Sequence, residues 1–178
     1  MARPVINSNV VFVIAPEVFR DEEYAYPREE LVSAGANVLT ASSRPGSCIG
    51  KLGMKAEAGL SVRSAANMRW DAVVFVGGQG ASCYFEDADA HALARKVYDA
   101  GGVVAAICIA PTILGKAGLL EGVAVTSFPS EKETLEALGA RWTGNTVEVS
   151  HAENAYIVTA NGPDAAREFG KTLVQTLA

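Results

Sequence analysis

Three short apolar runs, separated by longer amphipathic stretches, constrain the fold more than any other feature of this chain. They lie within NVVFVIA at 9–15, WDAVVFVGG at 70–78 and VVAAI at 103–107. Valine-rich runs in which polar and apolar residues do not alternate are typical of strands buried on both faces of a sheet. Helical patterns between the runs are typical of parallel strands joined by helices. We therefore expect an α/β fold in which helices cover both faces of a mostly parallel sheet.

The rest of the chain continues this alternation. Helices are expected at 26–35, 86–102, 130–140 and 163–178, and one more begins directly after Cys108. Further strands are expected at 36–42, 122–127, 145–150 and 154–161. The glycine-rich stretch 43–68 predicts short strands or a hairpin. Ser130 and Glu133 have the spacing of a capping box, in which each side chain satisfies a free backbone donor at a helix start. The 178 residues contain no repeat or linker, so we expect one domain over 1–178.

Charge and hydropathy exclude several classes of function. The net charge is −5 and the chain has no basic run or stripe, which argues against a nucleic-acid surface. No apolar stretch approaches the roughly 18 residues needed to cross a bilayer. The first residues lack a small-residue cleavage site and are interpreted as leading into a strand, not as a signal peptide. We therefore expect a soluble, cytoplasmic protein without nucleic-acid or membrane partners.

The cysteines and histidines argue against a metal site. Cys48, Cys83 and Cys108 are odd in number and have no CxxC spacing, which disfavours a disulfide framework and a zinc site. The two histidines, His91 and His151, do not form an HExxH motif. We expect free thiols in a reducing compartment, and neither a metal nor a cofactor.

Cys108 lies at a junction where a predicted strand turns into a predicted helix. Ligands of open α/β sheets bind outside the carboxyl ends of the strands, which marks Glu17, the pair Gly77–Gly78 and Cys108 as candidates. The position of Cys108 is similar to the nucleophile elbow of hydrolases. Free backbone N–H groups at a helix start favour an anion, so we expect a lowered thiol pKa and a reactive sulfur. The alternative is that Cys108 is a small buried hydrophobic residue, as free cysteine often is.

Glu17 and the glycine-rich turn GGQGA at 77–81 are the candidate partners of this thiol. A protonated Glu17 could donate a hydrogen bond to the thiolate and pass a proton to substrate, although it could equally be a solvated or helix-capping acid. A backbone N–H of the turn could stabilise an oxyanion, although a double glycine also suits any tight turn. The acidic run DEEY at 21–24 is interpreted as a solvated helix start, His91 as solvated, and His151 as part of a turn between strands.

Several longer stretches resemble the ThiJ/PfpI superfamily, which includes protein deglycases and intracellular proteases. They are VVFVGGQGA, AAICIAPTILGKAGLLEG followed by VTSFPS, and YIVTANGPDAAREFGKTLVQTL. The resemblance implies a flavodoxin-like three-layer sandwich and a homodimer or higher homo-oligomer. It also implies that Cys108 is the reactive cysteine, that Glu17 contacts its thiol, and that Gly78 and Ile109 supply the backbone N–H groups of an oxyanion pocket.

The chain departs from that family at the two positions where a histidine is expected. Ile109 follows the cysteine directly, and Phe128 occupies the position before Pro129. Without a histidine base, peptide hydrolysis by a PfpI-type peptidase or amidase is the least supported activity. We expect a cysteine-dependent hydrolase or lyase that acts on a small electrophile, such as a reactive carbonyl compound, through Cys108 and Glu17. The alternatives are a redox-responsive stress protein whose Cys108 oxidises to sulfinate, and a binding module that has lost the chemistry.

Overall fold

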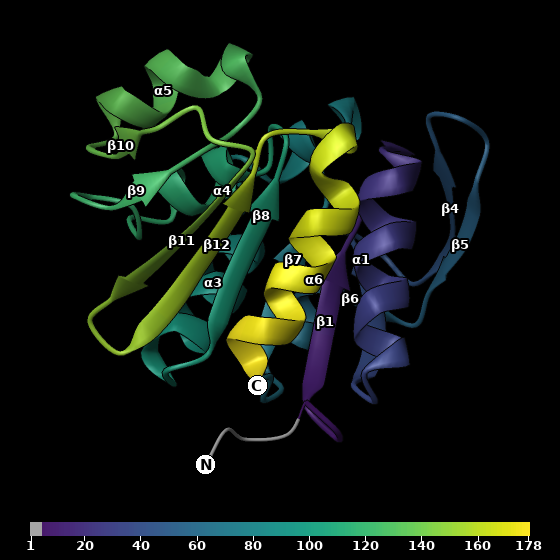
Figure 1. Ribbon diagram of the computed structural model, residues 1–178. Coiled ribbons are helices and arrows are strands. Elements are labelled where there is room, and N and C mark those ends of the chain that lie inside the picture. The colour runs from purple at the N-terminus through teal and green to yellow at the C-terminus, as the bar shows by residue number, and fades with distance from the viewer. Residues whose placement is uncertain (1–4) are drawn as a thin grey trace.

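A seven-stranded sheet runs through the centre of the computed structural model, which describes residues 5–178 (Figure 1). Its order is β11–β12–β8–β7–β1–β3–β6. The strands are β1 (Asn9–Val13), β3 (Asn37–Ser42), β6 (Leu60–Ser61), β7 (Ala72–Phe75), β8 (Val103–Ile107), β11 (Val147–Ala152) and β12 (Ala155–Ala160). Every neighbouring pair is parallel except the antiparallel edge pair β11–β12. The expectation of a mostly parallel sheet is therefore confirmed.

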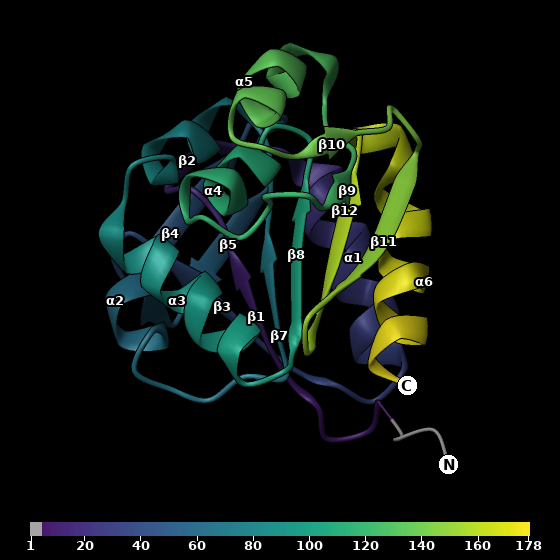
Figure 2. The ribbon, with the colours of Figure 1, turned by 90° about the vertical axis from the view of Figure 1, so that its left-hand side faces the viewer.

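Helices cover both faces of this sheet, as the buried strands require (Figure 2). Helices α1 (Asp21–Ser33) and α6 (Ala166–Leu177) pack on one face, and α2 (Val62–Ala65), α3 (Ala88–Asp99) and α4 (Pro111–Lys116) pack on the other. Each face has its own core, because side chains of β1, β7 and β8 alternate between the two clusters. Every residue of β7 and β8 is buried, which explains their unbroken apolar sequences.

Two small sheets lie outside the central one. Strand β2 (Glu17–Phe19) pairs with β4 (Gly46–Gly50), which forms an antiparallel hairpin with β5 (Lys55–Ala58), so the hairpin expected within 43–68 is present. The strand expected at 122–127 is only β9 (Ala124–Val125), which pairs with β10 (Arg141–Trp142). No helix within residues 5–178 has the length and hydropathy needed to cross a membrane.

Two helix starts differ from the sequence prediction. The capping box is wrong: Pro129 opens a short 3₁₀ turn, the Ser130 hydroxyl bonds the Glu131 carboxylate, and α5 (Lys132–Ala137) has no side-chain cap. Helix α1 begins at Asp21 and contains Pro27 in its interior, whereas the sequence suggested a start beside that proline. Three acidic residues occupy the first turn of α1, where the positive end of the helix favours them. The earlier start places this acidic turn at the carboxyl edge of the sheet.

Candidate active site

Cys108 occupies the sharp turn between β8 and α4 in a strained backbone conformation. Its φ is 65°, a left-handed value that is uncommon for residues other than glycine and costs free energy. Two hydrogen bonds hold the turn: the Cys108 N–H donates to the carbonyl of Ala160, and the Cys108 carbonyl accepts from the N–H of Phe128, both at 2.9 Å. The neighbouring chain segments therefore fix the direction in which the side chain leaves the sheet.

The Cys108 side chain is nearly buried and is faced by backbone amide groups. The residue is 9% exposed, and the N–H groups of Gly78 and Ile109 face its sulfur. Burial raises the thiol pKa to about 12, a negative charge on Glu23 raises it as well, and the two N–H groups lower it. The expectation of a lowered thiol pKa is therefore wrong, because desolvation raises the pKa of Cys108 more than the two amide donors lower it.

Glu23 is the acid that meets this thiol. It lies in the first turn of α1, is fully buried, and faces the Cys108 side chain and the backbone of Gly77. Neither carboxyl oxygen makes a hydrogen bond of ordinary geometry to any residue within 5–178. Burial raises its pKa to about 8, against an ordinary value of 4.5, and the contact with Cys108 lowers it less strongly. At neutral pH the site therefore holds a neutral carboxylic acid beside a thiol.

A glycine at position 77 allows the acid and the thiol to approach each other. A Cβ atom on Gly77 would lie 2.5 Å from Oε2 of Glu23 and 2.6 Å from Cβ of Cys108. Gly78 is equally confined: its φ is 93°, and a Cβ atom there would lie 2.5 Å from the carbonyl oxygen of Val18. The double glycine is thus required by close packing on both sides of the loop that carries the Gly78 N–H.

The structure does not bring Glu17 to the thiol, and this corrects the predicted acid. Glu17 is exposed at the start of β2 and pairs with Ile49 of the hairpin. The chain then turns at Val18, whose φ is 59°, and enters α1, so the acid that returns to the thiol comes six residues later. The other three predicted residues, Cys108, Gly78 and Ile109, do lie together.

The acidic run 21–24 is not a solvated helix start. Asp21 is 8% exposed and accepts the N–H groups of Leu52 and Met54, at 3.0 and 2.9 Å, which joins α1 to the hairpin. Glu22 forms an ion pair with Arg20 at 2.6 Å and is the acid of this run that reaches solvent. The run therefore contains a structural acid, a surface ion pair and the acid of the site.

Comparisons with known proteins show the family of this chain. Residues 8–176 match the sequence model of the DJ-1/PfpI family. The chain belongs to the DJ-1/PfpI family. Its fold is accordingly flavodoxin-like, and the resemblance noted from the sequence is confirmed.

Three members of the DJ-1/PfpI family illustrate the similarity. Deglycase PH1704 of Pyrococcus horikoshii is 34% identical over 164 residues, which cover 92% of this chain and 98% of the relative. Glutathione-independent glyoxalase DJR-1.2 of Caenorhabditis elegans is 26% identical over 173 residues, which cover 96% of this chain and 89% of the relative. The crystal structure of a ThiJ/PfpI domain protein from Brachyspira murdochii has a TM-score of 0.89 and 32% identity, and the match covers 97% of each chain.

No histidine contacts Cys108 within the described residues. The Nε2 atom of His91 lies 2.8 Å from the carbonyl oxygen of Phe85, so the predicted solvated histidine is buried. His151 lies in strand β11, not in a turn, and its ring lies tilted against that of Tyr156 with the centroids 4.7 Å apart. Phe128 is 44% exposed and is linked to Cys108 by its backbone alone. Within this part of the chain, Glu23 is the ionisable side chain that acts on the thiol.

A helical spacing in the sequence could have identified Glu23. Glu23, Pro27 and Leu31 follow one another at intervals of four residues, and all three are buried. Residues at i, i+4 and i+8 share one face of a helix, so an acid in register with an apolar pair faces the core. The signal was missed because the predicted helix began at residue 26 and left Glu23 outside it.

Proposed function

We propose that this protein is a cysteine-dependent enzyme that converts a small dicarbonyl compound of the methylglyoxal class into a hydroxy acid. The observation that carries the proposal is the buried pair of Glu23 and Cys108 beside the N–H groups of Gly78 and Ile109. Relatives in the family are named deglycase and glyoxalase, which supports activity on such carbonyl compounds. The near-complete burial of Cys108 favours a small substrate over a peptide.

The reaction begins when the pair has lost one proton. Burial places the pKa of Glu23 near 8, and the charge that forms there can pass to the sulfur when Glu23 takes the thiol proton. The thiolate attacks the aldehyde carbon of the substrate, a C–S bond forms, and the carbonyl π bond breaks. The N–H groups of Gly78 and Ile109 stabilise the resulting oxyanion, which then takes the proton from Glu23. The product of this step is a hemithioacetal.

The same carboxylate can complete the reaction. Glu23 removes the hydrogen from the former aldehyde carbon, which gives an enediolate, and returns that proton to the neighbouring carbon, while the hydroxyl proton moves from the former aldehyde oxygen to the neighbouring oxygen. The hemithioacetal thereby becomes a thioester of a 2-hydroxy acid without any external oxidant. Water then hydrolyses the thioester, releases the hydroxy acid and restores the Cys108 thiol. Glu23 therefore moves both the thiol proton and the carbon-bound proton, so these steps need no histidine at position 109 or 128.

The redox-responsive alternative is less well supported by the site. Oxidation of cysteine starts from the thiolate and requires access of the oxidant to the sulfur. Cys108 is 9% exposed and burial raises its pKa to about 12, both of which slow that reaction. Substrate chemistry differs because the attacking group needs to be ionised only within the reacting complex.

Conversion of methylglyoxal to lactate by the purified protein tests the proposal. Cys108→Ser and Glu23→Gln should each lower kcat/KM by at least about a hundredfold, because each removes a group that acts on the reacting atoms. In the wild type kcat/KM should rise with pH and level off above about pH 8, and Glu23→Gln should remove this dependence. Cys83→Ser is the matched control, since Cys83 is an exposed thiol outside the site. Equal activity of Cys108→Ser and the wild type would refute the proposal.

A further inference from the structure

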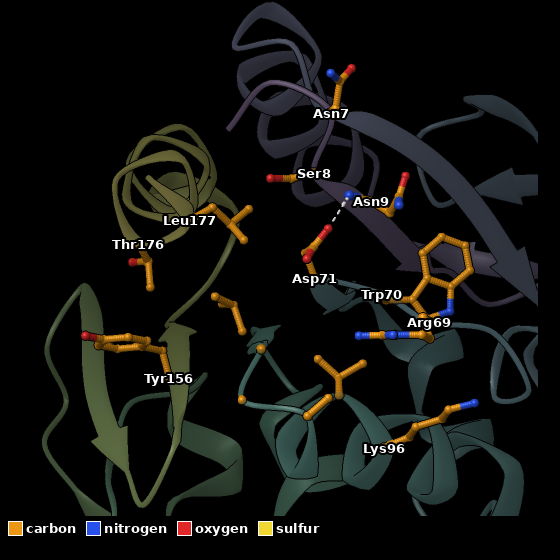
Figure 3. A pocket seen from close by; sticks show the side chains of 15 residues that line it. Asn7, Ser8, Asn9, Arg69, Trp70, Asp71, Lys96, Tyr156, Thr176 and Leu177 are labelled. Atoms are coloured by element: carbon orange, nitrogen blue, oxygen red, sulfur yellow. Dashed lines mark hydrogen bonds between the residues drawn. The ribbon is translucent and has the colours of Figure 1, made fainter. Parts of the chain in front are cut away.

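The opposite edge of the sheet holds a cavity of about 560 Å³, which does not include Cys108 (Figure 3). It is lined by residues that lie at the starts of β1, β7 and β8 and at the ends of α3 and α6. Its volume lies within the range of small-molecule sites in proteins. Strand β8 has five residues, so the cavity is separated from Cys108 by roughly 16 Å along that strand.

Two opposite charges face the same space in this cavity. The side chains of Asp71 and Arg69 point toward its centre, whereas the ammonium group of Lys96 points away (Figure 3). Asp71 accepts the N–H of Asn9 through Oδ2 at 2.7 Å, and a carboxylate can accept further hydrogen bonds. Among residues 5–178, Asp71 and Arg69 do not form an ion pair with each other. A molecule placed between them would meet an anion on one side and a cation on the other.

The remaining wall of the cavity is partly apolar and partly polar, and Asn7, Ser8 and Thr176 belong to its polar part. Leu177, Val97 and Val103 form the apolar part, whereas the ring of Tyr156 points away from the centre of the cavity (Figure 3) and lies against His151. Helix α3 ends at Asp99, directly before the lining residues Ala100 and Gly101, and the carboxyl end of a helix favours a positive charge. An ammonium group is therefore favoured by Asp71 and by this helix end together.

We propose that this cavity binds an α-amino acid with an apolar side chain. The ammonium group of the ligand would lie at Asp71, its carboxylate at the guanidinium of Arg69, and its side chain against Leu177 and Val103. Arginine pairs with carboxylates through two parallel hydrogen bonds, which fixes the orientation of the ligand. The site is distinct from the Cys108 pocket and does not depend on the chemistry proposed there.

Calorimetric titration of the wild-type protein with three related probes tests this site. L-Leucine carries both charges, N-acetyl-L-leucine lacks the ammonium group, and L-leucinamide lacks the carboxylate. L-Leucine should bind, and each blocked probe should bind at least about tenfold more weakly, because each loses one of the two charge-assisted contacts. Absence of leucine binding at millimolar concentration, or equal binding of all three probes, would overturn the proposal.

Substitutions locate the binding site and separate it from the thiol. Arg69→Gln should weaken binding of leucine about tenfold and leave leucinamide unchanged, whereas Asp71→Asn should weaken leucine and leave N-acetyl-leucine unchanged. Arg63→Gln is the matched control, because Arg63 is an exposed arginine paired with Asp89 outside the cavity. Cys108→Ser should bind leucine as the wild type does. Loss of binding in Cys108→Ser, or unchanged binding in Arg69→Gln, would contradict the assignment.

Discussion

The proton held by Glu23 links the candidate active site to the stability of the fold. The unfolded chain releases this proton near the ordinary pKa of 4.5, whereas burial raises the pKa of Glu23 in the folded chain to about 8. Between these pH values the folded state holds a proton that the unfolded state has lost. The stability that this proton provides is complete below pH 4.5 and is lost as the pH rises through about 8.

We therefore expect the free energy of unfolding of the wild type to fall as the pH rises from about 4.5 to 8. The loss is at most about 5 kcal/mol, because each unit by which the pKa of Glu23 differs between the folded and unfolded chain is worth about 1.4 kcal/mol. Glu23→Gln carries no proton to lose and should remove this slope. Urea denaturation of both proteins at a series of pH values measures the difference. If the two curves ran parallel with pH, the proton would not reside on Glu23.

At the scale of single residues, the sequence predicted the cysteine of the candidate site and missed its acid. Cys108 was predictable because an apolar strand and a helix meet at it, and a parallel sheet places that junction at its ligand-binding edge. The acid was not predictable by distance from a strand end, because Glu17 and Glu23 both follow β1 and only the start of α1 decides between them. That start depends on the turn at Val18, which the sequence does not reveal, since valine rarely adopts a positive φ.

Among the elements, the turn formed by residues 17–20 is strained and lies next to the site. Val18 has a φ of 59°, and the pairing of β2 with β4 shifts register around it. Its carbonyl oxygen packs on Gly78, and the N–H of Arg20 donates to the carbonyl of Gly77 at 3.0 Å. The turn therefore supports the loop whose N–H faces the Cys108 sulfur. A positive φ costs more free energy for a β-branched residue than for one with a short polar side chain.

Val18→Asn should stabilise the protein by about 1 kcal/mol, because asparagine tolerates the left-handed conformation that valine resists. The backbone of the turn is unchanged, so the activity assigned to Cys108 should stay within about twofold of the wild type. Thermal unfolding and the methylglyoxal assay measure the two effects. Val32→Asn, at an exposed valine in α1, is the control and should give no gain. A lower melting temperature for Val18→Asn would show that its side-chain contacts matter more than its backbone strain.

The predicted elements were most accurate where burial alone decides the structure. Strands β1, β7 and β8 are confirmed because their residues face core on both sides and must be apolar. The strand at 122–127 and the capping box failed because both belong to the peripheral segment around β9 and α5, where local bonds such as that of Ser130 to Glu131 decide. Strands β9 and β10 pair over only two residues each, so a strand ladder constrains this segment less than it constrains the central sheet.

For the molecule as a whole, the sequence predicted the layers but not the order of the strands. Apolar strands alternating with helices imply a sheet covered on both sides, and the structure confirms this (Figures 1 and 2). The order depends on pairings between segments far apart in the sequence, such as β12 with β8 and β1 with β7, which leave no local pattern. The result is a sheet whose two edges differ: Cys108 and Glu23 occupy the carboxyl edge, and the cavity of Asp71 and Arg69 occupies the other.

This layering predicts an uneven distribution of stability over the molecule. Strands β7 and β8 have strands on both sides and helices on both faces, so their amides can exchange with solvent only when the whole domain unfolds. Strands β9 and β10 have two residues each and pair only with one another, so they can open locally. Hydrogen–deuterium exchange should therefore be at least about a hundredfold slower in peptides of β7 and β8 than in peptides of β9 and β10. Equal rates in the two groups would mean that the peripheral segment opens only together with the central sheet.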